Sequence, residues 1–266
     1  MDSQKLNICI CPLKINWNQK KDNFIKLTEA LSEMHPDTDL FILPETFSTG
    51  FPVGKSLEEV TDLGENENGE TISLLKSLSL KYNIAIAGTF IAKSEDSLFN
   101  RAFFVEPSGD VYYSDKAHLF RIGGEDKIFT SGNKRMNIRF RGWSISLVVC
   151  YDIRFPVWCR NKNNEYEVLV VVSNWPEVRD NVWKTLLCAR AIENLSYVCG
   201  ANCEGFDAAN QLRYSGGSFV FDFKGKEIST RIQGSNLVYA SLNKKKIEEF
   251  REKFPAWKDS DNFKLI

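Results

Sequence analysis

The hydrophobic positions in the first third of the chain change period repeatedly, which predicts strands and helices in alternation. Residues 6–13 alternate between apolar and polar, as in a half-buried strand, and residues 19–34 repeat their apolar positions with a helical period. A short buried strand is predicted over 39–43, a helix over 70–82, and a strand that is apolar on both faces over 84–92. This order indicates β-α units.

The remainder of the chain is richer in strands. Residues 107–110 carry turn chemistry, Pro-Ser-Gly-Asp, between two strand-like runs, and Arg141-Gly142 separates two more. The glycine-rich and charged stretch 117–134 has no clear period and is predicted to be a surface loop, which at this length usually has a function. The other predicted strands are 100–106, 111–116, 136–140, 143–150, 167–173, 197–201, 217–223 and 236–242, and the helices are 178–194, with Val182, Leu186, Ala189 and Ile192 on its apolar face, and 244–254.

These elements predict an α/β protein with mixed sheets. Helices interleave with strands, yet several neighbouring strands form hairpins, so the sheets cannot be purely parallel. Two sheets packed face to face with helices outside would satisfy this pattern. A chain of 266 residues with 43% hydrophobic content can bury one large core, so a single domain over 1–266 is predicted.

Charge and cysteine content exclude several classes of protein. Lys and Arg number 34 and Asp and Glu number 35, a net charge of −1, which supplies no basic face for nucleic acid. No signal peptide or membrane span is evident, and we expect a cytoplasmic protein with no membrane partner. The seven cysteines are an odd number without a C-x-x-C pair, which argues against a disulfide framework and against a metal site.

Three polar residues that follow predicted strands form a chemically coherent set. Cys150 directly follows the apolar run 144–149, and Glu45 follows the predicted strand 39–43. Lys116 is the last residue of the predicted strand 111–116. Ligands bind at the carboxyl ends of strands in open α/β sheets. An ammonium group stabilises a thiolate, and a carboxylate can take the thiol proton and return it to a leaving amine. The set therefore predicts a cysteine nucleophile with Glu45 as general base and acid.

Other interpretations of Cys150 remain open at this stage. Cysteine is often only a small buried hydrophobe. A dyad with His118 is conceivable, although no group that would orient the histidine is evident. A redox sensor would pair Cys150 with Cys159, and a catalytically silent binding protein would have no chemical reason to retain Glu45, Lys116 and Cys150 together.

The segments around these residues resemble the three signatures of the nitrilase, or carbon–nitrogen hydrolase, superfamily. They are 43–47 (Leu-Pro-Glu-Thr-Phe), 115–120 (Asp-Lys-Ala-His-Leu-Phe) and 149–156 (Val-Cys-Tyr-Asp-Ile-Arg-Phe-Pro), and they occur in the family's order. The segments 100–110 and 173–176 extend the resemblance over nearly the whole chain. The sequence is most similar to the omega-amidase branch, which hydrolyses the side-chain amide of 2-oxoglutaramate and 2-oxosuccinamate.

This resemblance implies an α-β-β-α sandwich, a thioester intermediate on Cys150, and a homodimer. It implies no cofactor and no metal, with a small-molecule substrate as the only other partner. The family's second glutamate lies six positions before the proline of a Pro-Gly pair. Here the pair is Ser131-Gly132, and the count reaches Glu125, with neighbouring Asp126 as the competing candidate.

Candidate substrate-binding residues follow from the expected chemistry. The backbone N–H of Tyr151 would join Lys116 in stabilising an oxyanion. A 2-oxo acid needs a cation for its carboxylate, and the candidates are Arg154, Arg179 and Arg121, although such arginines are often ion-pair partners instead. Trp175 and Phe51 are candidates for the pocket wall, although aromatic residues after strands often belong to the core. Pocket shape, which decides between an amide, a nitrile and an N-carbamoyl amine, is not evident from sequence.

Overall fold

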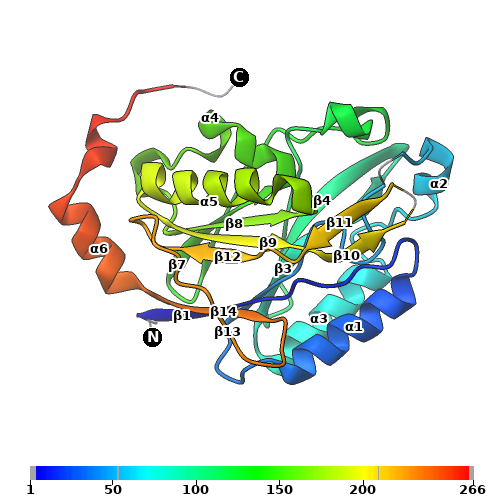
Figure 1. Cartoon of the computed structure of the whole chain (residues 1–266), viewed down its shortest axis with the longest axis horizontal. Helices are drawn as coiled ribbons and strands as arrows, with labels where there is room; N and C mark the ends of the chain where they lie inside the picture. The colour runs from blue at the N-terminus through cyan, green and yellow to red at the C-terminus, as the bar shows by residue number, and fades with distance from the viewer. Residues whose placement is uncertain (1–3, 53, 209, 264–266) are drawn as a thin grey trace.

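The computed structural model describes residues 4–52, 54–208 and 210–263 (Figure 1). Its first sheet has the strand order β13-β14-β1-β2-β3-β4-β5. The pairs β1–β2 and β2–β3 are parallel and the others are antiparallel. The strands are β1 (Lys5–Ile10), β2 (Leu40–Ile42), β3 (Ala85–Ser94), β4 (Ser97–Val105), β5 (Val111–Asp115), β13 (Thr230–Arg231) and β14 (Val238–Asn243).

The second sheet has the order β12-β9-β8-β7-β6, with β7, β8 and β9 parallel to one another. Antiparallel strands close both of its edges. Its strands are β6 (Met136–Phe140), β7 (Trp143–Val149), β8 (Val168–Ser173), β9 (Tyr197–Asn202) and β12 (Phe219–Phe221). Two mixed sheets confirm the predicted sheet type.

Helices cover the outer faces of the two sheets. Figure 1 shows α1 and α3 together on one side of the molecule and α4 and α5 on the opposite side. The helices are α1 (Lys20–Glu33), α2 (Leu57–Thr61), α3 (Glu70–Tyr82), α4 (Pro156–Cys159), α5 (Asp180–Asn194) and α6 (Lys244–Lys253). This is the predicted α-β-β-α sandwich. Among the described residues, every helix is too short or too polar to span a bilayer.

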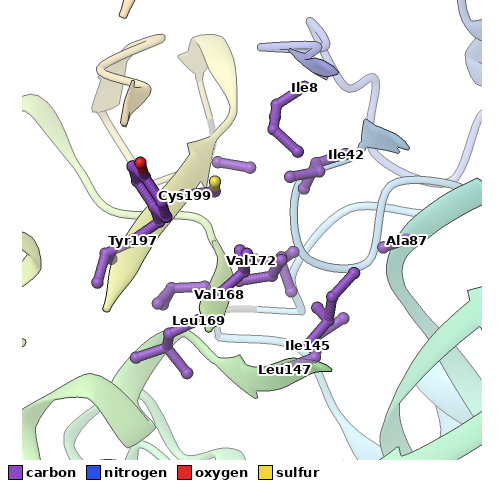
Figure 2. Packing of buried hydrophobic residues seen from close by; sticks show 14 of the residues in the cluster. Ile8, Ile42, Ala87, Ile145, Leu147, Val168, Leu169, Val172, Tyr197 and Cys199 are labelled. Carbon is purple, nitrogen blue, oxygen red and sulfur yellow. The ribbon is translucent and has the colours of Figure 1, made fainter. Parts of the chain in front are cut away.

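The main core lies between the sheets and continues under α5. Figure 2 shows members of this cluster from both sheets, among them Ile8, Ile42 and Ala87 of the first and Ile145 and Val172 of the second. A second cluster fills the space between the first sheet and α1 and α3. The residues of β2, β7 and β8 are buried on both faces of their strands, because each sheet is covered on both sides. Rigid, fully buried strands therefore support the loops at their carboxyl ends.

One predicted helix face was wrong. We expected α5 to bury Val182, Leu186, Ala189 and Ile192, but Val182 is 38% exposed and Ile192 is 50% exposed. The helix instead buries a stripe displaced by about one residue, whose members are Trp183, Leu187, Arg190, Ala191 and Asn194. The Arg190 guanidinium donates hydrogen bonds to the carbonyl of Ile153, and the Trp183 ring N–H donates one to the carbonyl of Gly217. These polar contacts select the buried face, and a pattern of hydrophobic residues does not reveal them.

Some elements were not predicted from the sequence. A hairpin of β10 (Glu204–Asp207) and β11 (Leu212–Ser215) forms a small separate sheet, and α2 and β13 are also additional. The segment 117–134 is not a plain loop, because it contains 3-10 turns over Arg121–Gly123 and Glu125–Lys127. These elements are short, and their sequences carry no periodic hydrophobic signal.

Candidate active site

Glu45 lies fully buried just after β2, on a segment that is fixed from several sides. Its Oε2 accepts a hydrogen bond of 3.1 Å from the backbone N–H of Asn174, and its own carbonyl accepts one of 2.9 Å from the Asn174 side chain. The next residue, Thr46, has a φ of +45° and donates its N–H to Thr89 Oγ1. A non-glycine residue in this conformation costs about 1–3 kcal/mol, so the surrounding contacts must hold it.

Lys116 directly follows β5 and its side chain is completely buried. Its Nζ lies 2.9 Å from Glu45 Oε1 and 2.8 Å from Glu125 Oε2. The backbone approaches closely here, because a Cβ atom at Gly132 would lie 2.1 Å from the carbonyl oxygen of Asp115. Glycine at 132 therefore allows the 117–134 segment to fold back against Lys116, and the Gly132 N–H donates to the Lys116 carbonyl.

Glu125 completes an ionic cluster that the structure builds from three separate segments. It is buried, and its Oε2 accepts a hydrogen bond of 2.6 Å from the Phe120 N–H. The amide of Asn100 donates to both Glu45 and Glu125, at 2.8 Å and 3.2 Å. The competing candidate Asp126 is exposed, so Glu125 is the acid that contacts Lys116. A segment expected on the surface thus contributes a buried carboxylate.

Cys150 occupies the sharp turn between β7 and the 3-10 helix Cys150–Arg154. Its φ is +48°, a strained conformation for a cysteine, and the side chain is held at the strand's end. The Glu45 carboxylate and the Asn174 N–H are among the groups that influence the pKa of this thiol, which lines the same cavity as Lys116 and Asn174. Cys150, Glu45 and Lys116, predicted as a set, therefore converge on one point.

Burial and charge determine the protonation of this cluster. Burial, and then the negative charge of Glu45, raises the pKa of the Cys150 thiol well above its usual value, although Lys116 opposes this. Burial would lower the pKa of Lys116, but the carboxylates of Glu125 and Glu45 outweigh it and raise this pKa. Burial and the charge of Glu45 raise the pKa of Glu125 against the opposing effect of Lys116. The resting state therefore contains a neutral thiol and a charged lysine.

Asp152 holds the turn that carries Cys150. Its Oδ2 accepts the N–H of Val149 at 3.0 Å, and its Oδ1 accepts both the N–H of His118 at 2.9 Å and the ring Nδ1 of His118 at 2.8 Å. The imidazole also stacks on Phe155, with ring centroids 3.7 Å apart. The expectation that His118 lacks an orienting partner was wrong. Asp152 therefore holds the His118 ring against the turn that carries Cys150, and it connects this turn to the segment after Lys116.

Asp152→Ala is expected to lower kcat about 10–100-fold with little change in KM. Three donors lose their acceptor, each costing about 1–3 kcal/mol when buried, and the strained turn at Cys150 can relax. Steady-state kinetics and the rate of Cys150 alkylation by iodoacetamide measure this. The matched variant His118→Ala removes only the ring contact and should lose less. Wild-type kcat in Asp152→Ala would contradict the positioning role.

A cavity of about 180 Å³ opens onto Cys150 and Lys116. Its wall contains all five residues that we predicted to bind substrate: Phe51, Tyr151, Arg154, Trp175 and Arg179. Trp175 is also core, as it packs on Trp183 at 5.6 Å. The third arginine candidate, Arg121, lines a neighbouring cavity instead.

The two arginines in the wall stack on aromatic rings. The Arg154 guanidinium lies 4.9 Å from the ring centroid of Trp175, and that of Arg179 lies 5.4 Å from that of Phe120. Neither forms an ion pair with a carboxylate in the part of the chain that the structure describes. The alternative of a structural ion-pair partner, considered from sequence, is therefore not observed for them, and both charges are available at the cavity.

Sequence reasoning missed three residues of the site. Asn100 and Asn174 orient the carboxylates, and Tyr214 of the β10–β11 hairpin closes the cavity wall. A fully buried asparagine inside the apolar strand β4 is a signal that could have identified Asn100, since a buried amide needs polar partners. Tyr214 carries no comparable signal. Among the described residues, no cluster of three or more His, Cys, Asp or Glu side chains could hold a metal ion.

Comparisons with known proteins agree with this geometry. The family model for carbon-nitrogen hydrolases matches residues 7–252. Omega-amidase YafV of Escherichia coli is 39% identical over 85% of this chain and 86% of its own, and the 2-oxoglutaramate amidase of Bacillus subtilis is 28% identical over 96% and 97%. The crystal structure of a CN-hydrolase superfamily protein from Xanthomonas campestris, with an arsenic adduct in its active site, superposes with a TM-score of 0.92. It is 36% identical, and the match covers 99% of this chain and 100% of that protein.

Proposed function

Because this chain belongs to the carbon–nitrogen hydrolase family, we propose that it is an omega-amidase that hydrolyses the side-chain amide of 2-oxo acid amides such as 2-oxoglutaramate and 2-oxosuccinamate. The observation that carries the proposal is the cluster of Cys150, Glu45, Lys116 and Glu125 at the base of a cavity with two available arginines. The products are the 2-oxo dicarboxylate and ammonia.

The first step is attack of the Cys150 thiol on the amide carbon, which gives a tetrahedral intermediate. Because the thiol is neutral at rest, it must lose its proton as it attacks the amide carbon, and Glu45 is the carboxylate whose charge acts most strongly on it. Negative charge then develops on the carbonyl oxygen. The Lys116 ammonium and the Tyr151 N–H, at the start of a 3-10 helix, stabilise it, and each such donor contributes on the order of 3 kcal/mol in a water-poor site.

The tetrahedral intermediate then collapses to a thioester on Cys150, and the two products leave one after the other. Glu45 returns its proton to the amide nitrogen, the C–N bond breaks, and ammonia leaves. Glu45 then takes a proton from a water molecule that attacks the thioester, which frees the acid and restores the thiol. Glu125 holds Lys116 in place throughout, since the carboxylates of Glu125 and Glu45 both form ion pairs with the ammonium group.

The cavity wall suits an acid that carries an amide at its other end. Arg154 and Arg179 each present a planar guanidinium, which matches a carboxylate with two parallel hydrogen bonds. Phe51 and Trp175 supply apolar surface for the carbon chain between the two ends. A cavity of about 180 Å³ favours a small substrate.

We also propose a homodimer in the cytoplasm. The partly exposed apolar residues Val182, Leu186 and Ile192 on α5 offer a surface that a second copy could cover. All seven cysteines are free thiols, which suits a reducing compartment.

The function is tested by ammonia release from 2-oxoglutaramate, glutamine, asparagine and a simple nitrile, with the wild type and with Arg154→Met. We expect the wild type to prefer the oxo-amide strongly. Loss of the bidentate cation should raise KM for 2-oxoglutaramate about 10–100-fold, since a charge-assisted hydrogen bond is worth roughly 1.5–3 kcal/mol. An inert oxo-amide, beside rapid alkylation of Cys150, would mean that the pocket serves another amide.

A further inference from the structure

A second chamber adjoins the catalytic cavity and shares three lining residues with it. It has a volume of about 330 Å³, roughly ten times the ~30 Å³ that one water molecule occupies in the liquid. Phe51, Asn174 and Tyr214 line both spaces. The chamber is otherwise bounded by the segment 15–17 and by residues of the β10–β11 hairpin.

Asn174 connects this chamber to Glu45. Asn174, which lines the chamber, donates its backbone N–H to Glu45 Oε2 at 3.1 Å. Burial is the largest cause that raises the pKa of Cys203, which lines the chamber and not the catalytic cavity, and the charge of Glu45 raises this pKa further. Lys116, which lies 2.9 Å from Glu45 Oε1, lines the catalytic cavity, so a residue in contact with Glu45 stands in the wall of each space. The amide nitrogen, which takes its proton from Glu45 in the proposed mechanism, would therefore lie close to both spaces.

The two spaces have opposite electrostatic character. The charged residues in the catalytic cavity wall are Lys116, Arg154 and Arg179, all cations. Those in the chamber wall are Lys55, Glu204 and Asp207, with a net charge of −1. Lys55 also forms an ion pair with Glu59 at 3.6 Å and lies over the Trp17 ring, and both contacts weaken the positive potential that Lys55 adds to the chamber. Carboxylates beside aromatic rings attract ammonium groups, so the chamber suits an amine as the cavity suits an acid.

We infer that this chamber receives the substituent on the amide nitrogen, so that the enzyme hydrolyses N-alkyl amides of 2-oxo dicarboxylic acids as well as primary amides. The inference rests on the proposed function. The reaction is R–CO–NH–R′ + H2O → R–COO⁻ + R′–NH3⁺: the thiol attacks the carbonyl carbon, Glu45 transfers the thiol proton to nitrogen, and the C–N bond breaks. The amine R′–NH2 leaves through the chamber and takes up a proton in solution, and water releases the acid from the thioester.

The test compares 2-oxoglutaramate with its N-ethyl amide, using mass spectrometry to quantify ethylamine and 2-oxoglutarate. We expect kcat/KM for the N-ethyl amide to lie within about tenfold of that for the primary amide, because a large preformed space avoids a steric penalty. No ethylamine release by an enzyme that hydrolyses the primary amide would overturn the chamber assignment and leave the proposed function intact. An inert primary amide would overturn both.

A pair of variants in the hairpin locates the N-ethyl group. Ala208→Phe adds bulk to the chamber wall, and we expect the ratio of kcat/KM for the N-ethyl amide to that for the primary amide to fall at least tenfold. Arg213→Phe adds an aromatic ring to the same hairpin at a side chain that is 72% exposed and lines neither space, and it should keep the wild-type ratio. An unchanged ratio in Ala208→Phe would contradict the inference.

Discussion

Cys150→Ala is expected to lower amide turnover at least about 10⁴-fold while the protein stays folded. Removing the nucleophile of a covalent mechanism eliminates the thioester route, and the remaining binding and oxyanion groups supply only a small residual rate. The substitution removes one sulfur atom from a buried turn and leaves the Cβ carbon in place as a methyl group, a small change in volume. Ammonia release and circular dichroism measure activity and fold, and intact-mass spectra should show no acyl-enzyme.

Cys188→Ala is the matched control for this substitution. Cys188 lies half-buried on α5, away from the catalytic cavity, and its Sγ contacts the carbonyl of Gly225. We expect wild-type kcat/KM, which would separate loss of the nucleophile from a general effect of cysteine removal. Turnover near the wild-type rate in Cys150→Ala would refute the thioester mechanism.

Lys116→Met is expected to reduce both activity and stability. The oxyanion loses a charged donor, which should lower kcat about 10²–10³-fold. Two carboxylates, Glu45 and Glu125, then remain buried without their cation. Breaking a buried ionic cluster by removing one partner typically costs about 3–5 kcal/mol, and we expect the free energy of unfolding at pH 7 to fall by this amount. Kinetics and urea denaturation measure the two effects.

The double variant Lys116→Met/Glu125→Gln separates the two roles of the lysine. Neutralising Glu125 removes one uncompensated buried charge, so part of the lost free energy of unfolding should return. Activity should not return, because glutamine restores no cation beside the oxyanion. Recovery of kcat together with stability would show that Lys116 acts only through folding.

The composition of the cluster was predictable from sequence because strand ends are local features. The apolar runs before Glu45 and Cys150 predict buried strands, and the polar residues after them therefore lie at the sheets' carboxyl edges. The apolar periods of residues 19–34 and 70–82 likewise predict α1 and α3, which the structure forms over Lys20–Glu33 and Glu70–Tyr82. The apolar periodicity of α5 predicted the wrong buried face. The face that is buried includes Arg190 and Asn194, whose hydrogen-bond partners lie more than thirty residues away in the chain.

The sequence by itself therefore predicted the two mixed sheets and the outer helices, and it singled out Glu45, Lys116 and Cys150, which the structure brings together, since hydrophobic period and residue chemistry act locally. Only the tertiary structure showed that Glu125 rather than Asp126 contacts Lys116 and that Asn100 bridges the two glutamates. Only it placed Tyr214 between two adjoining spaces. These contacts join segments separated by tens of residues, and their distances depend on how the two sheets pack, which no local pattern encodes.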